Sequence, residues 1–177
     1  MTTATRMTES ELIDACLAQD RLAQKMLYDR YSAAMFTLAY RMTNDFELAN
    51  DALQEAFVKI FRSLHQFRRE STLGAWIKTI VTRTTLGLIK KQIQFSPLPD
   101  DINHHIVDWG HALDVEYLEK AIQGLPSGYR TVFVLIEVEG FSHKEVAELL
   151  NISVGTTKSQ LFHARKKLKE YLETMEK

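Results

Sequence analysis

The chain has 177 residues, of which 45% are hydrophobic and 25% charged, and its formal net charge at neutral pH is −1. Its length suits one ordinary domain or two small ones, and its hydrophobic fraction is too high for a disordered protein. No stretch approaches the roughly 20 consecutive apolar residues of a membrane span, and no apolar signal core follows the polar N-terminus, so we expect a cytoplasmic protein with no direct membrane insertion.

Helical spacing of the apolar residues predicts an all-α chain. Only 7 Gly and 3 Pro interrupt the sequence, and no sustained alternating pattern indicates a strand. In the N-terminal half, helices are expected over residues 8–19, 22–42, 46–65 and 72–92. Asn44 and Asp45 mark a turn, the polar segment 66–71 indicates a loop, and Ser71 or Thr72 is placed to cap the fourth helix.

The segment 93–112 shows no helical period and contains two of the three prolines, which indicates a linker. Beyond it, two further helices are expected over residues 113–123 and 126–138. We therefore predict two small helical domains, residues 8–92 and 113–177, joined by a flexible linker.

The pattern from Ser142 to Tyr171 predicts a helix-turn-helix. Ser142 and Glu145 fit a capping box at the start of a short helix, and Asn151-Ile152-Ser153 fits a tight turn before a longer helix. In such a motif the second helix enters the major groove of DNA. The alternative is an ordinary amphipathic helix with solvated lysines.

A helical projection of the longer helix separates an apolar side from a small, polar and basic outer side. Arg165 projects near the apolar side, so we expect it to pair with a structural acid. Gln160 flanks the outer side and is expected to read an adenine, whereas the lysines are expected to meet phosphates. The predicted DNA contacts are Gly155, Thr156, Lys158, Ser159, Gln160, His163, Lys166 and Lys167.

Charge is distributed unevenly along the chain. Residues 71–99 and 149–169 contain no Asp or Glu but several Lys and Arg, whereas residues 96–116 contain five acids and no Lys or Arg. One such run alone fits a solvated helix face equally well. Two runs separated by an acidic spacer favour two contacts with a nucleic acid.

Several motifs in this order resemble the extracytoplasmic-function (group IV) sigma factors of bacterial RNA polymerase. In the C-terminal half the similar residues are Leu125-Pro126, Arg130 to Phe133, Glu139 to Ser159 and His163 to Leu168. In the N-terminal half, Asp51 to Phe57 resembles region 2.2 of that family. Regions 2.3 and 2.4 are matched by Phe67-Arg68, Ser71 to Leu73, Trp76-Ile77, Ile80 and Lys90-Lys91.

The resemblance implies a transcription initiation factor whose partners are core RNA polymerase, promoter DNA and an anti-sigma factor. Region 2 would span residues 8–92, and region 4, which reads the −35 element, would span residues 113–177. Polymerase binding is assigned to Asp51, Gln54 and Glu55, which share one helix face. Contacts with the −10 element are assigned to Phe67, Arg68, Lys78, Thr79, Thr82, Arg83, Lys90 and Lys91.

Four positions depart from the family's usual residues: Arg83, Gly87, Thr157 and Gln160. They bear on promoter choice rather than on membership of the family. Trp76 lies at helical spacing with Ile77 and is more typical of a core residue than of a base-stacking one.

Other functions fit the sequence less well. A stand-alone helix-turn-helix regulator would leave the Asp51 to Phe57 motif unexplained, and a protein-binding adaptor would leave the outer face of the last helix unexplained. We expect no enzyme, no cofactor and no metal site, because no nucleophile–base pair or phosphate-binding loop is present. Cys16 is the only cysteine, and His104, His105 and His111 lack the spacing of helix-borne ligands.

Overall fold

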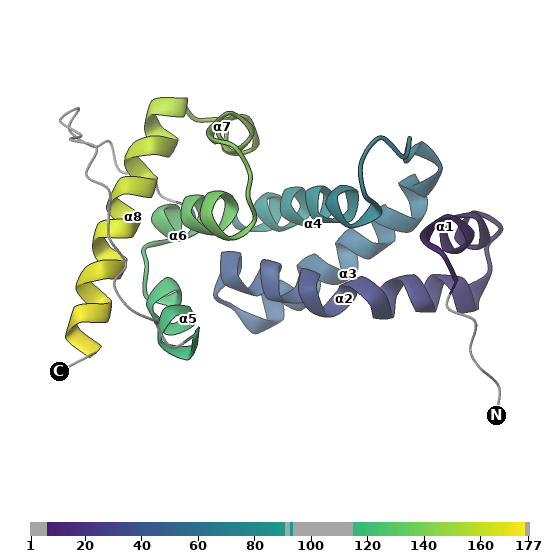
Figure 1. Cartoon of the computed structure of the whole chain (residues 1–177), viewed down its shortest axis with the longest axis horizontal. Helices are drawn as coiled ribbons and strands as arrows, with labels where there is room; N and C mark the ends of the chain where they lie inside the picture. Colours follow the sequence, from purple (N-terminus) through teal and green to yellow (C-terminus); the bar gives the residue numbers. More distant parts are fainter. Residues whose placement is uncertain (1–6, 91–92, 94–114, 176–177) are drawn as a thin grey trace. The chain divides into compact units, whose positions relative to one another are not determined.

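A computed structural model describes residues 7–90, 93 and 115–175 (Figure 1). The chain divides into two compact units, residues 1–40 with 45–88 and residues 41–44 with 89–177. The described residues form helices and connecting turns without a strand, which confirms the predicted all-α fold of two small helical parts.

Four α-helices and one short 3₁₀ helix form the first unit: α1 (Glu9–Leu17), α2 (Arg21–Thr43), α3 (Phe46–Ser63), η1 (Leu64–Gln66) and α4 (Leu73–Ile89). Three of the starts carry a local signal. Thr8 and Glu11 form a capping box at α1. Asp45 caps α3 by accepting a hydrogen bond from the Leu48 backbone at 2.9 Å. Thr72 accepts from the Ala75 backbone at 3.2 Å, which identifies it as the cap of α4.

Small residues let the helices of the first unit approach closely. Ala39 of α2 is fully buried against Ala49 and Ala52 of α3, and Leu88 of α4 packs on the same cluster. Removing these side chains from water stabilises the unit in proportion to the apolar area buried. The opposite side of α3 faces solvent.

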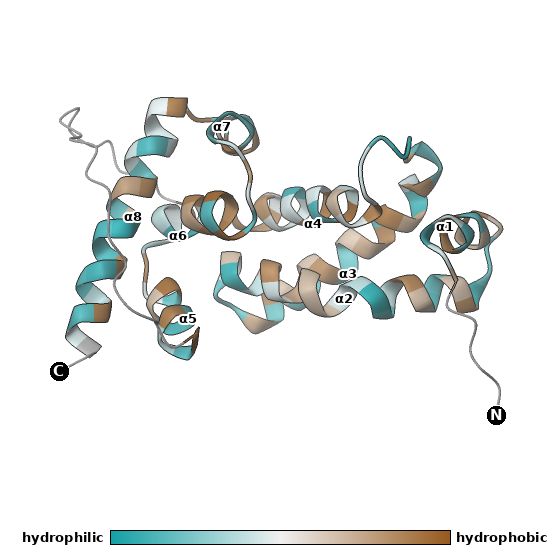
Figure 2. Ribbon diagram, viewed as in Figure 1, coloured by the Kyte–Doolittle hydropathy of each residue, from teal (hydrophilic) through white to brown (hydrophobic). Residues whose placement is uncertain are grey.

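The second unit contains α5 (Val115–Gln123), α6 (Ser127–Phe133), a π-helical segment η2 (Val134–Val138), α7 (His143–Leu150) and α8 (Val154–Met175). Helices α5, α6 and α7 all contact α8, which is the central helix of this unit. Hydrophilic and hydrophobic residues alternate along α8 (Figure 2), as a helix with one buried side requires.

Arg130 is a structural residue of this unit. Its side chain is 8% exposed, and its Nη1 donates to the carbonyl oxygens of Leu125 at 2.9 Å and Gln123 at 3.2 Å. These carbonyls lie where α5 ends and lack helical partners, so the guanidinium satisfies them. Burial lowers the pKa of Arg130.

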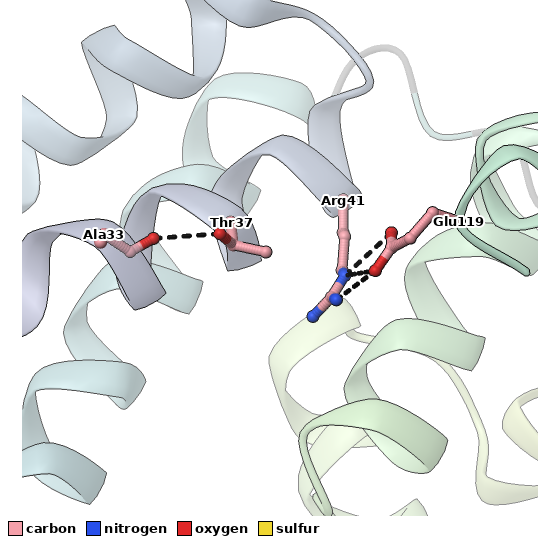
Figure 3. A network of polar contacts seen from close by, with 4 residues as sticks. All are labelled: Ala33, Thr37, Arg41 and Glu119. Carbon is pink, nitrogen blue, oxygen red and sulfur yellow. Dashed lines mark hydrogen bonds and ion pairs between the residues drawn. The ribbon is translucent and has the colours of Figure 1, made fainter. Parts of the chain in front are cut away.

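The last turn of α2 groups with the second unit. There, Arg41 Nε donates to the two carboxylate oxygens of Glu119 at 3.0 and 3.2 Å (Figure 3). One turn earlier, the Thr37 hydroxyl donates to the carbonyl oxygen of Ala33 at 3.0 Å (Figure 3).

Helix ends differ from the prediction by a few residues. Helix α8 continues to Met175 rather than ending at Tyr171, and α4 ends at Ile89 rather than at residue 92. The predicted linker, residues 93–112, lies outside the described residues except for Ile93, so the proposed domain boundaries stay a prediction. No helix in the described part of the chain is long and apolar enough to cross a membrane.

Candidate nucleic-acid interface

The predicted capping box opens helix α7. The Ser142 hydroxyl accepts from the Glu145 backbone at 3.2 Å, and the Glu145 carboxylate accepts from the Ser142 backbone at 2.7 Å. These hydrogen bonds stabilise the charged carboxylate and so lower the pKa of Glu145. The start of the motif is thereby fixed, as the sequence predicted.

A tight turn joins α7 to α8. Asn151 adopts a left-handed backbone conformation with φ at +55° and ends α7. Ser153 then caps α8 by accepting from the Thr156 backbone at 3.0 Å. The helix-turn-helix prediction is therefore confirmed in its local geometry.

A side-chain hydrogen bond also ties the two helices together. His143 Nδ1 lies 2.9 Å from the Thr157 hydroxyl oxygen, and that hydroxyl donates to the Val154 carbonyl at 2.8 Å. With its proton directed at the Val154 carbonyl, the Thr157 hydroxyl oxygen can accept from a protonated His143 Nδ1. Burial, together with the cationic Lys158 and Arg165, lowers the pKa of His143.

The outer face of α8 is basic and partly aromatic. Gly155, Lys158 and Lys166 are exposed, while Thr156, His163 and Lys167 are half-buried. The His163 ring stacks on Tyr129 of α6, with 5.9 Å between ring centroids, and meets the edge of Phe162 at 5.3 Å. Burial and the neighbouring Lys166 and Lys167 lower the pKa of His163.

Sequence reasoning missed the two aromatic residues that hold His163. Phe162 projects off the apolar side of α8, and an aromatic residue beside the predicted reading face was a usable signal in the sequence. Tyr129 lies in α6 and is separated from α8 by η2 and α7, so no local pattern links it to His163.

Two residues predicted for the outer face are buried. Gln160 is 0% exposed, because it lies one turn after Thr157 and one turn before Ala164, which are also fully buried. Ser159 is 8% exposed, and its hydroxyl donates to the carbonyls of Gly155 and Thr156, each at 3.1 Å. The prediction that these two side chains face DNA was wrong.

Arg165 behaves as the sequence predicted. It forms an ion pair with Glu137 of η2, so its charge is matched by a structural acid of the same unit.

An exposed polar face lies on α3. Asp51, Gln54 and Glu55 are all exposed, opposite the buried stripe of this helix. Glu55 pairs with Lys59 at 2.6 Å, and Val58, 50% exposed, continues the same face. The carboxylates of this face can accept charge-assisted hydrogen bonds from Arg side chains of a partner protein.

The loop 67–72 and helix α4 carry the remaining predicted contacts. Phe67 is half-buried against Trp76, with 5.4 Å between ring centroids, whereas Arg68 is exposed. Further along, Arg83 of α4 and Lys90, the residue that follows α4, are exposed.

The other predicted residues of α4 are less accessible. Lys78 and Thr79 are half-buried, and the Thr79 hydroxyl donates to the Ala75 carbonyl at 3.0 Å. Thr82 is 0% exposed, so the prediction that it lines a DNA strand was wrong. It lies one turn before the equally buried Thr85 and follows that side of the helix inward. Lys91 lies outside the described residues, as do His104, His105 and His111.

Comparison with known families matches both units. Residues 27–93 match the family described as Sigma-70 region 2, and residues 115–168 match Sigma-70, region 4. The chain belongs to the sigma-70 family. Both matched regions contain the motifs on which the resemblance rested.

Relatives place this sigma factor in the extracytoplasmic-function (ECF) group. It is 27% identical to the ECF RNA polymerase sigma-E factor of Haemophilus influenzae, over 97% of this chain and 99% of that protein. It is 26% identical to the ECF RNA polymerase sigma factor SigE of Mycolicibacterium smegmatis, over 82% of this chain but only 60% of that longer relative.

A solved structure agrees with this assignment. The sigma factor RpoE of Bartonella quintana, determined in complex with the anti-sigma factor NepR, is 26% identical to this chain with a TM-score of 0.57. The similarity covers 84% of this chain and 96% of RpoE. This sigma factor is therefore a transcription initiation factor, and a stand-alone regulator is not favoured, because region 2 is present beside the helix-turn-helix.

Proposed function

We propose that this sigma factor binds core RNA polymerase through Asp51, Gln54 and Glu55 and directs it to promoters through two separate DNA contacts. The single observation that carries the proposal is the exposed basic face of α8, held by a capped helix-turn-helix, in a chain that also presents the region 2 face on α3. A protein that only bound DNA would not need the exposed region 2 face on α3.

The −35 contact is assigned to the accessible part of the outer face of α8. Lys158, Lys166 and Lys167 supply charge for phosphates, which positions the helix without reading sequence. Thr156 and His163 carry the side chains that can meet base edges, and Gly155 lets the backbone approach the groove wall.

The −10 contact is assigned to the loop 67–72 and to α4. Opening a duplex requires a site that receives an unstacked base and cations that hold the strand. The loop offers Phe67 and exposed Arg68 for the base. Exposed Arg83 of α4, with Lys90 directly after this helix, is offered for the strand.

Regulation and location follow from the same function. An anti-sigma factor is the proposed regulatory partner, supported by the NepR complex of the similar RpoE. The factor itself catalyses no reaction, since polymerase supplies the chemistry. Its place of work is the cytoplasm, where the polymerase transcribes.

Transcription in vitro with purified core polymerase, with and without this chain, tests the proposal on a library of genomic fragments. Specific initiation is expected only when the factor is present. The double variant Asp51→Lys/Glu55→Lys should retain its helical circular dichroism but bind core at least about 30-fold more weakly, because breaking a close charge contact costs about 2 kcal/mol or more.

A matched control makes the same charge change elsewhere. Asp29→Lys/Glu173→Lys reverses two exposed acids that lie outside the α3 face. Equal retention of core by both double variants would refute the assigned polymerase surface.

A further inference from the structure

Helix α1 makes polar contacts that converge on the loop 67–72. Arg69 Nη2 donates to Asp14 Oδ1 at 2.6 Å, and Arg69 Nη1 donates to Ser10 Oγ at 2.5 Å. At the end of the loop, the backbone N–H of Leu73 points to Glu9 Oε1 at 3.4 Å. Three side chains from two successive turns of α1 thus reach one short loop and the helix start that follows it.

The backbone of Arg69 is itself unusual. Its φ is +59°, in the left-handed region that residues with a side chain rarely adopt. Such a conformation persists only where the surroundings hold it, and it is often found at functional sites. Here the bonds to Ser10 and Asp14 hold the side chain of the same residue.

Helix α1 is firmly anchored and therefore a suitable support. Its Leu12, Ile13 and Cys16 are buried in the unit. Glu9 also accepts a hydrogen bond from the Tyr31 hydroxyl of α2 at 3.3 Å. The first turn of α4 approaches the same tyrosine, since a Cβ added at Gly74 would lie 3.3 Å from Tyr31 Cε1.

The other side of the loop is held by α4. Phe67 packs on Trp76, and Thr72 caps the helix. Between these fixed points Arg68, Glu70 and Ser71 remain exposed. The loop is therefore shaped by α1 and α4 while its tip is open to solvent.

Electrostatics indicates that Asp14 of α1 serves to hold the conformation of the loop rather than to bind DNA. Asp14 is exposed, and a carboxylate beside a surface that binds a polyanion weakens that binding through charge repulsion. Its contact with Arg69 also partly neutralises a cation that would otherwise be available to phosphates. An acid placed here is explained by its hydrogen bond to the loop.

We propose that α1 sets the conformation of the loop 67–72 that receives the −10 strand, with Asp14 and Ser10 acting through Arg69. These are positioning residues, and they touch no DNA. The inference rests on the proposed function, because it assumes that this loop binds the −10 element.

The test measures binding of a −10 strand by holoenzyme assembled from core polymerase and the full-length factor. The probe is the fluorescein-labelled non-template single strand of a promoter selected by the wild-type holoenzyme from a random duplex library. Asp14→Ala is expected to weaken binding of this strand about 2- to 5-fold, the loss that one exposed ion pair can account for. Pure charge reasoning gives the opposite sign, since losing an acid strengthens binding to DNA.

Two matched variants isolate the hydrogen bond from the charge. Asp29→Ala removes an exposed acid that pairs with Lys25 on α2, and it should leave binding unchanged or slightly tighter. Asp14→Asn removes the same charge as Asp14→Ala but keeps an oxygen that accepts from Arg69. It should therefore retain most of the wild-type affinity.

Further readouts separate positioning from misfolding. The Asp14–Arg69 pair is exposed, so Asp14→Ala should leave the melting temperature, binding of core and binding of a −35 duplex nearly unchanged. Arg69→Ala should weaken strand binding. Adding Asp14→Ala to it should weaken binding no further, because Asp14 acts only through Arg69.

The negative outcomes are distinguishable. If the wild-type holoenzyme fails to bind the selected strand, the proposed function of the loop is refuted. If the wild type binds and Asp14→Ala binds equally well or more tightly, only the positioning role of α1 is overturned. A loss in Asp29→Ala equal to that in Asp14→Ala would also overturn it.

Discussion

Replacing Gln160 with methionine should stabilise the second unit. The Gln160 side chain is fully buried, and neither its amide oxygen nor its amide nitrogen has a hydrogen-bond partner among the described residues. Methionine has a similar unbranched length and a similar helix propensity, so it fills the same space without the two polar atoms. The substitution therefore removes a desolvation cost and creates no cavity.

The expected gain follows from the cost of an unpaired buried amide. Leaving such a group unsatisfied costs about 1–3 kcal/mol, so the free energy of local unfolding should rise by this amount. Hydrogen exchange of backbone amides in α8 would then slow by about 5- to 150-fold. Mass spectrometry of peptides from α8 in the full-length protein measures this change directly.

Thr157→Val is the matched control, since Thr157 is equally buried and lies one turn away. Its hydroxyl is fully used, so valine should accelerate exchange in α8 by removing the bonds to Val154 and His143. A selection of −35 sequences should give the same preference for Gln160→Met and wild type. Faster exchange in Gln160→Met, or a changed base preference, would refute the conclusion that Gln160 is a buried and unpaired residue.

Other substitutions test single features. Gly87→Ala should stabilise α4 by about 0.5–1 kcal/mol in urea denaturation, because a Cβ there meets nothing within 4 Å, and a loss of stability would contradict this. Arg130→Lys should lower the melting temperature, because a compact and strongly hydrated ammonium is costlier to bury than the delocalised guanidinium, and an unchanged value would argue against the structural role of Arg130. The pKa of His143 is lowered in the folded protein, so the unfolded chain takes up a proton first as the pH falls below about 6.5. The free energy of unfolding should therefore fall with pH there more steeply in wild type than in His143→Gln. Parallel plots of this free energy against pH would exclude the contribution of His143. Lys166→Ala should weaken binding to all −35 duplexes alike and lower by about one the slope of the logarithm of the binding constant against the logarithm of the salt concentration. A loss of binding confined to one sequence would instead identify Lys166 as a base contact.

Helix starts were predictable because their signals are local. Thr8, Asp45 and Ser142 each accept a hydrogen bond from a backbone amide three residues ahead, and the sequence shows that spacing directly. The exposed face of α3 was predictable for a similar reason, since its buried stripe repeats with the helical period.

Burial at the edge of a helix face was not predictable in the same way. A projection places Gln160 between the two sides of α8, and its polarity alone assigned it to the outer one. Packing of neighbouring helices decides such cases, and it turned Gln160 and Thr82 inward. The contact between Asp14 and Arg69 spans 55 residues, so no local pattern contains it.

The π-helical segment η2 lets this part of the chain tolerate the loss of one residue. The Glu139 backbone donates to the Val134 carbonyl five residues earlier at 2.9 Å, so the segment holds about one residue more per turn than an α-helix would. Deleting a single residue here would convert the wide turn into an ordinary helical turn and leave the orientation of the flanking residues nearly unchanged. A deletion within α6 would instead rotate the residues on one side of it by about 100° relative to those on the other, and α6 would lose part of its packing on α8. Related chains should therefore differ by one residue in η2 more readily than in α6.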